Sequence, residues 1–170
     1  MITLPHSRLQ IPHDRLRVSS LKEIPMHDGV AFTATLRLDG RRVGVIEDEG
    51  RGGGAQFHPD PGAGFGYDEL NTFAAACRRD HRAVSTESVL GDLVTEYDLT
   101  RRVKRATAKR GTVLRLVGAD GYAIELATVR VMPRTDYQRQ RVADELGPPS
   151  EGHWEMWNGQ AWQPLNPAES

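Results

Sequence analysis

Apolar residues occupy every second position from Phe32 to Leu38. This period of two predicts a strand with one buried face and one solvated face. Asp39 and Gly40 follow, and this pair favours a type I′ turn, because both central residues of that turn take a positive φ. We therefore expect a return strand over residues 42–47. A turn at residues 118–121 between strands at residues 112–116 and 122–131 predicts a second hairpin, and residues 16–24 permit a further short strand.

Apolar residues spaced three and four apart predict helices elsewhere in the chain. We expect Asp68 to cap the first helix, whose apolar stripe consists of Leu70, Phe73, Ala74 and Cys77. A second helical pattern opens at Ser85, shows a break or a fresh cap at residues 98–100, and then resumes until Gly111 stops it. Residues 137–146 predict a short polar helix that ends at a glycine and two prolines.

All three tryptophans lie between residues 154 and 162, around Asn158–Gly159. Like Asp39–Gly40, this Asn-Gly pair favours a two-residue hairpin turn. With those two residues as the loop, Trp157 and Trp162 become diagonal neighbours on one face. The pair would form either an apolar patch for a partner, since tryptophan is enriched at interfaces, or a lid that packs the C-terminal segment onto the domain. The sequence leaves both interpretations open.

These patterns together predict an α+β fold: an antiparallel sheet of two hairpins covered by two or three helices, with a C-terminal Trp-rich hairpin. We expect residues 1–15 to form an irregular N-terminal arm, because Pro5 and Pro12 interrupt them and no period is sustained. Residues 16–147 then form a single domain, and residues 148–170 form the tryptophan hairpin and tail.

The length of 170 residues and the composition are typical of a one-domain protein with a polar surface. The formal net charge is -1, so attraction to nucleic acid or membrane must come from a local patch. A single cysteine excludes an internal disulfide, and no apolar run reaches the roughly 20 residues that span a bilayer. We expect a cytoplasmic protein without a cofactor, and the preference for arginine over lysine suggests an actinobacterial host.

Four glycines surround Arg51 in the run from Gly50 to Gly54, directly after the acidic residues Glu47, Asp48 and Glu49. Glycine is costly to order, so this run indicates positive φ angles or a close backbone approach. We interpret it as a shaped contact loop made of Asp48, Gly50, Arg51, Gly52, Gly53 and Gly54. A phosphate-binding loop is the alternative, but no Gly-Lys-Ser or Gly-Lys-Thr follows and three carboxylates would repel an anion.

No arrangement of residues indicates catalysis. Asp48, Glu49, His58 and Asp60 could gather around a divalent cation, but their spacing matches no known ligand pattern, and such clusters are usually solvated turn residues. Cys77 falls on an apolar helix stripe, where cysteine behaves as a small buried hydrophobe. We therefore predict neither catalytic residues nor a metal site.

A basic run is the strongest positive electrostatic feature; it contains Arg101, Arg102, Lys104, Arg105, Lys109 and Arg110. On a helix, Arg101, Arg105 and Lys109 would stack at i, i+4 and i+8 and could follow a phosphate backbone. The alternative is a solvated face whose charges offset the acidic loop. Nucleic-acid contact through Arg101, Arg102, Lys104, Arg105 and Lys109 is therefore a candidate function.

The order of these elements resembles small proteins carried by phages, plasmids and integrated elements. The resemblance covers residues 30–147 and rests on the strand at residues 31–36, the Asp-Gly turn, the acidic-Gly-Arg-Gly-Gly loop, and the Leu-Arg-Leu-x-Gly strand at residues 114–118. It implies a mobile-element origin and an α+β fold, and it transfers no catalytic residue. The N-terminal arm and the tryptophan tail depart from the pattern.

We therefore expect a small non-enzymatic binding or regulatory protein that acts on a host or phage macromolecule, with a protein as the partner. Two alternatives stay open: a nucleic-acid-binding protein that uses the basic segment 101–110, and an enzyme that acts on a phosphorylated small molecule at the glycine loop.

Overall fold

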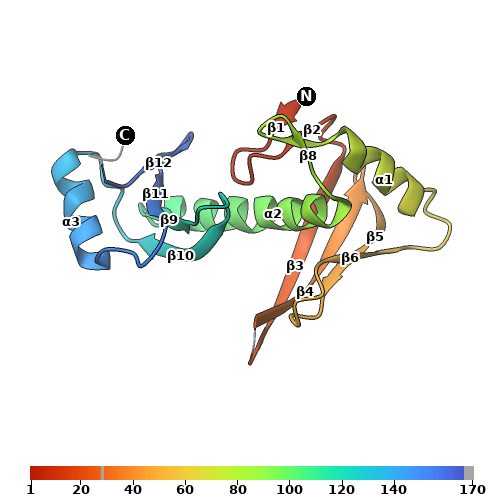
Figure 1. Cartoon of the computed structure of the whole chain (residues 1–170), viewed down its shortest axis with the longest axis horizontal. Helices are drawn as coiled ribbons and strands as arrows, with labels where there is room; N and C mark the ends of the chain where they lie inside the picture. The colour runs from red at the N-terminus through yellow and green to blue at the C-terminus, as the bar shows by residue number, and fades with distance from the viewer. Residues whose placement is uncertain (28, 167–170) are drawn as a thin grey trace. The chain divides into compact units, whose positions relative to one another are not determined.

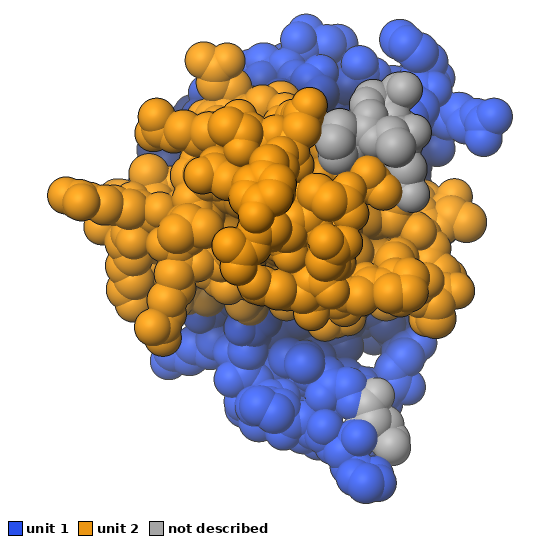
Figure 2. Space-filling model, turned by 90° about the vertical axis from the view of Figure 1, so that its left-hand side faces the viewer, with its two compact units in different colours: residues 1–99 blue, residues 100–170 orange. Residues whose placement is uncertain are grey.

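The computed structural model describes residues 1–27 and 29–166 and has an α+β fold, as the sequence predicts (Figure 1). The chain divides into two compact units, residues 1–99 (unit 1) and residues 100–170 (unit 2), which Figure 2 colours separately. The boundary falls within helix α2 (Thr86–Ala108). It does not coincide with either domain boundary expected from the sequence, at residues 15 and 147.

A four-stranded antiparallel sheet forms the frame of unit 1. Its strands follow chain order: β3 (Leu16–Met26), β4 (Gly29–Leu38), β5 (Arg41–Asp48) and β6 (Gln56–Pro59). The predicted turn between β4 and β5 is confirmed, because Asp39 has a φ of +50° and Gly40 a φ of +79°.

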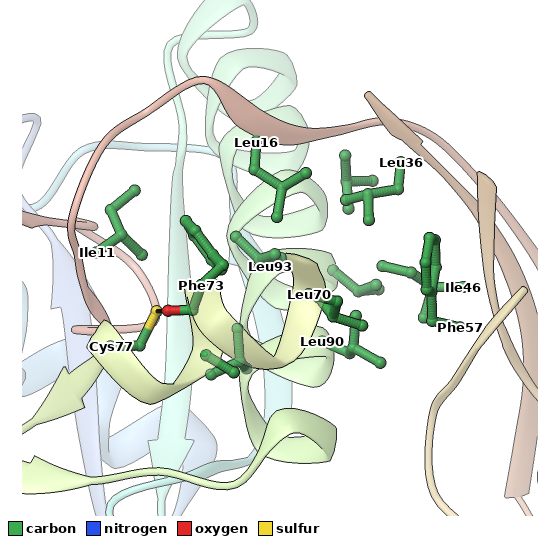
Figure 3. Packing of buried hydrophobic residues seen from close by; sticks show 14 of the residues in the cluster. Ile11, Leu16, Leu36, Ile46, Phe57, Leu70, Phe73, Cys77, Leu90 and Leu93 are labelled. Carbon is green, nitrogen blue, oxygen red and sulfur yellow. Dashed lines mark hydrogen bonds between the residues drawn. The ribbon is translucent and has the colours of Figure 1, made fainter. Parts of the chain in front are cut away.

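Helix α1 (Tyr67–Ala76) and the first part of α2 supply the remaining core of unit 1. Figure 3 shows Leu70 and Phe73 of α1 and Leu90 and Leu93 of α2 packed with side chains from the sheet. Asp68 does not cap α1. The N-cap is Gly66, whose N–H donates to the Glu69 carboxylate at 2.7 Å, because Glu69 occupies the third helical position, from which a side chain can reach back.

The N-terminal segment is not the irregular arm that we expected. It contains β1 (Ile2–Thr3) and β2 (Gln10–Ile11), which join β7 (Arg78–Arg79) and β8 (Arg82–Ala83) in a second antiparallel sheet. Leu9 and Ile11 are buried. Burial of such side chains stabilises a fold by about 1.5–3 kcal/mol each, which offsets the entropy lost when the segment is ordered.

Unit 2 is built on a third antiparallel sheet with the strand order β10-β9-β11-β12. These strands are β9 (Thr112–Val117), β10 (Ala123–Val129), β11 (His153–Trp157) and β12 (Trp162–Pro164), with helix α3 (Asp136–Leu146) between β10 and β11. Both predicted hairpins therefore exist, but they lie in different sheets. Strand β9 pairs with the tryptophan hairpin on its other side, so its second edge is already occupied.

Helix α2 is continuous from Thr86 to Ala108, without the break that residues 98–100 suggested. None of the helices in the described part of the chain is long and apolar enough to cross a membrane.

A carboxylate of α2 binds the N-terminal segment. Glu96 Oε2 accepts the backbone N–H groups of His6 and Ser7, both at 2.9 Å, and the Ser7 hydroxyl at 3.2 Å. His6 is itself buried. The turn between β1 and β2 thus meets a single acceptor from a residue about 90 positions later in the chain.

Replacing Glu96 with alanine should remove this anchor. Because three partly buried donors would lose a charged acceptor, we expect the free energy of unfolding to fall by about 2–4 kcal/mol. Far-UV circular dichroism during denaturation measures this loss; tryptophan fluorescence does not report on unit 1, since all three tryptophans lie in unit 2. Thr95→Ala, at an exposed neighbouring position, is the control, and an equal loss in both variants would contradict the prediction.

One turn earlier in α2, Asp92 is buried and pairs with the Arg79 guanidinium. Burial raises the pKa of Asp92 to about 6, although Arg79 lowers this pKa; Glu96 raises it further. The protonated carboxyl is therefore favoured more in the folded chain than in the unfolded chain.

Asp92 should accordingly contribute stability at low pH. This contribution is complete below a pH of about 4 and is lost as the pH rises through about 6, because the folded state then holds an ionised buried carboxylate. Relative to Asp92→Asn, the wild type should lose up to about 3 kcal/mol of unfolding free energy between pH 4 and pH 7. Paired denaturation curves across this range measure the difference, and a difference that stays constant would refute the assignment.

Candidate functional site

The predicted contact loop connects β5 to β6, and its first glycine lies against the backbone of β4. A Cβ added to Gly50 would come within 2.8 Å of the Ala31 nitrogen and 2.9 Å of the Val30 carbonyl carbon. Gly50 has a φ of +70°, and its N–H donates to Asp48 Oδ1 at 2.7 Å. This glycine is therefore required both by its backbone conformation and by the close approach to β4.

The other three glycines of the loop have different surroundings. A Cβ at Gly54 would meet the Glu87 carboxylate in the first turn of α2, whereas nothing lies within 4 Å of the corresponding positions at Gly52 and Gly53. Glu87 thus adds a fourth carboxylate to the three that precede the loop. This negative charge makes the loop unsuitable for a phosphate group.

The loop lies beside a hairpin end that extends beyond the core. Leu21 and Phe32 are the last side chains of β3 and β4 that pack on the core of unit 1. Farther along the hairpin, Ile24, Met26 and Val30 are 62%, 43% and 49% exposed. We call these three residues the apolar tip, and Figure 1 shows this end of β3 and β4 extending past α1.

The strand register places apolar side chains on both faces of the tip. Ile24 pairs with Ala31 and Pro25 pairs with Val30, so Ile24 and Met26 project from one face and Val30 from the other. A recess of about 340 Å³ lies on the first face, between the tip and the glycine loop. Its lining includes Ile24, Thr33, Glu47, Asp48, Glu49 and Arg51.

Three of the four residues considered as metal ligands have partners outside this set. Asp48 accepts from the Gly50 N–H, Asp60 pairs with Arg42 at 2.8 Å, and His58 lies 3.4 Å from Glu47. Within residues 1–27 and 29–166, no group of three or more His, Cys, Asp or Glu residues is placed to hold a metal ion.

Cys77 is buried at the end of α1, and its thiol donates to the Phe73 carbonyl at 3.3 Å (Figure 3). Burial raises the pKa of this thiol to about 11. The thiolate is the reactive form of cysteine, so this environment suppresses nucleophilic chemistry at Cys77.

Trp157 and Trp162 do not form an exposed patch, because they are only 7% and 9% exposed. They pair directly across the hairpin, with ring centroids 5.4 Å apart, and the loop between them contains four residues rather than two. Asn158 Oδ1 accepts the N–H groups of Gln160 and Ala161, which stabilises the longer loop. Arg115 stacks over Trp162 at 4.2 Å and donates to the buried Glu155 at 2.7 Å.

The basic run is divided between a helix and the turn that ends it. Lys104 and Arg105 are exposed on α2, but Lys109 and Arg110 follow the last helical residue, Ala108. Arg101 and Arg102 are half-buried and engaged in contacts within the chain. The continuous helical ridge expected from Arg101 to Lys109 is therefore not present.

The apolar tip was not found from the sequence, although its residues alternate as in a buried strand. Ile24, Met26 and Val30 have the period of two that also describes the core positions farther along β4. Nothing local shows where the helices stop covering the sheet. The glycine run predicts that some backbone lies close to the loop, but it does not identify that backbone as β4.

Comparison of the chain with protein-family models, with curated proteins and with solved structures found no match.

Two alanine substitutions within the loop should separate its structural glycine from its open one. Gly50→Ala should lower the unfolding free energy by about 2–4 kcal/mol, because it adds a clash with β4 to an unfavourable positive φ. Gly53→Ala, which has open space and no positive φ, should change it by less than about 1 kcal/mol. Hydrogen exchange at residues 29–33 shows whether the tip loosens in the first variant, and similar exchange in both variants would count against the contact.

Proposed function

We propose that this chain is a small non-enzymatic binding protein of mobile-element origin that acts on a host or phage protein. The observation that carries the proposal is the apolar tip, which holds three large exposed side chains beside a glycine loop whose Gly50 packs on β4. Exposed apolar side chains that adjoin on one surface are typical of interaction sites, and Ile24 and Met26 adjoin on one face of this hairpin. The actinobacterial host and the cytoplasmic location remain part of this proposal.

The loop and the tip together suggest the chemistry of the partner surface. The recess between them has three carboxylates, from Glu47, Asp48 and Glu49, against one guanidinium, from Arg51. Apolar anchors with a charged rim are typical of protein interfaces. We therefore infer a partner with an apolar recess that receives Ile24 and Met26, surrounded by a rim that is mainly basic.

Contact through side chains is favoured over strand addition. Strand β3 is an edge of its sheet, but it carries a bulge at Ser19, charged side chains at Lys22 and Glu23, and a proline at position 25. These features are the usual protection of an edge strand against pairing with another chain. The exposed side chains of the tip are thus the more accessible part of this hairpin.

A photo-crosslinking amino acid at position 26 tests where the partner binds. In host lysate we expect one dominant crosslinked protein from position 26 and none from position 2. Ile2 is 43% exposed in the same unit and serves as the matched site. A crosslink to a second copy of this chain, or equal products from both positions, would contradict the proposal.

The purified partner then allows a quantitative test. Ile24→Asn with Met26→Gln should weaken its binding at least about tenfold, as expected for central anchors, while Ile2→Asn leaves it unchanged. Glu49→Lys should slow association at low salt, because the rim would lose its complementary charge. Melting temperatures near that of the wild type show that the variants are folded. Unchanged binding in the first variant would exclude the tip as the binding surface.

A further inference from the structure

Five exposed cations gather at one corner of unit 2, and we call them the basic corner: Lys104, Arg105, Lys109, Arg110 and Arg130. Lys104 and Arg105 lie on the last turns of α2, and Lys109 and Arg110 lie in the turn that follows. Gly111 joins this turn to the end of β10, because a Cβ there would lie 2.2 Å from the Val129 oxygen and 3.3 Å from the Arg130 Cα. Residues far apart in sequence thus contribute to one charged surface.

These cations are not neutralised within the described residues 1–27 and 29–166. None of the five side chains forms an ion pair with a described carboxylate, whereas Arg139 pairs with Asp136 and Arg141 with Glu145 in the same unit. A cluster of unpaired cations repels itself, so it raises the electrostatic energy of the folded chain. A negatively charged ligand would remove that repulsion.

Arg110 occupies a position where glycine would be more favourable. The N–H of Arg110 donates to the Thr107 carbonyl and that of Gly111 to the Ala106 carbonyl, which is the Schellman arrangement at a helix C-terminus. Arg110 has a φ of +60°, the left-handed conformation that favours glycine. An arginine at a position that favours glycine costs stability, so a role of its side chain outside the fold would offset that cost.

We propose that the basic corner binds the phosphate backbone of a nucleic acid. Lysine and arginine side chains dominate such contacts, and each bound phosphate releases condensed counterions. A membrane surface is less suitable, because helices that lie on membranes present large apolar side chains beside their cations. Here Ala106 is buried and Val103 is half-buried, so α2 exposes no such face beside Lys104 and Arg105; Val131, which follows Arg130, is the one large apolar side chain exposed next to a cation of the corner among the described residues. This proposal is independent of the apolar tip in unit 1.

Arg110→Gly provides a sharp test, because it removes the charge while relieving the backbone. Fluorescence anisotropy with labelled 20-mers of duplex DNA, single-stranded DNA and RNA should show binding that weakens as salt rises. We expect Arg110→Gly to weaken that binding at least about threefold and to reduce the slope of log K against log salt by about 0.7–0.9. Its melting temperature should equal or exceed that of the wild type.

Lys104→Gln with Arg105→Gln should weaken binding further, reducing the slope by about 1.4–1.8. Arg141→Gln, an exposed arginine that already has a carboxylate partner, is the control and should leave affinity unchanged. The proposal is overturned if no nucleic acid binds at low salt, if the control weakens binding as much as Arg110→Gly does, or if only vesicles of anionic lipid are bound.

Discussion

The surface for which we infer a function depends on the pairing of β3 with β4 beyond the end of the hydrophobic core. Two-stranded hairpins are marginally stable in water, so a hairpin end needs additional support. Strand β5 supplies it only as far as the pair Phe32–Asp48. Beyond that pair, Gly50 lies on the backbone of Val30 and Ala31. Gly50 is therefore first a structural residue, because it supports a hairpin end whose apolar side chains stay uncovered.

Buried and half-buried charges join distant segments of the chain in both units. In unit 1 Glu96 binds the N-terminal turn and Asp92 pairs with Arg79; in unit 2 Arg115 pairs with Glu155 under Trp162. Replacing a buried ion pair with apolar residues is often neutral, but removing one partner costs about 3–5 kcal/mol. Such pairs favour one arrangement of the segments over its alternatives. The Arg115 guanidinium also packs against the ring of Trp162, and this contact helps to bury the tryptophan hairpin.

The sequence predicts elements whose signal is local and misses those set by distant contacts. The Asp39–Gly40 turn and the α1 stripe depend on backbone preference and period alone, and both are present. Which strands pair with each hairpin depends on which sheet edge is free, and nothing in the local sequence shows this. The sequence therefore does not predict that the two hairpins lie in different sheets. The two-residue strands at the N-terminus are too short to show a period. The tryptophan register was wrong because the Asn158 side chain competes with the tight turn that Asn-Gly usually favours.

The distribution of charge shows why whole-chain values can mislead. Residues 1–99 contain eleven Lys and Arg against fifteen Asp and Glu, whereas residues 100–170 contain eleven against eight. The two excesses nearly cancel in the formal net charge of -1, which by itself argues against nucleic-acid binding. Electrostatic attraction acts over about 8–10 Å in physiological salt, so a ligand responds to the nearby charges rather than to the sum. The acidic loop of unit 1 and the basic corner of unit 2 therefore favour opposite kinds of ligand, and the two proposed binding surfaces do not compete for one partner.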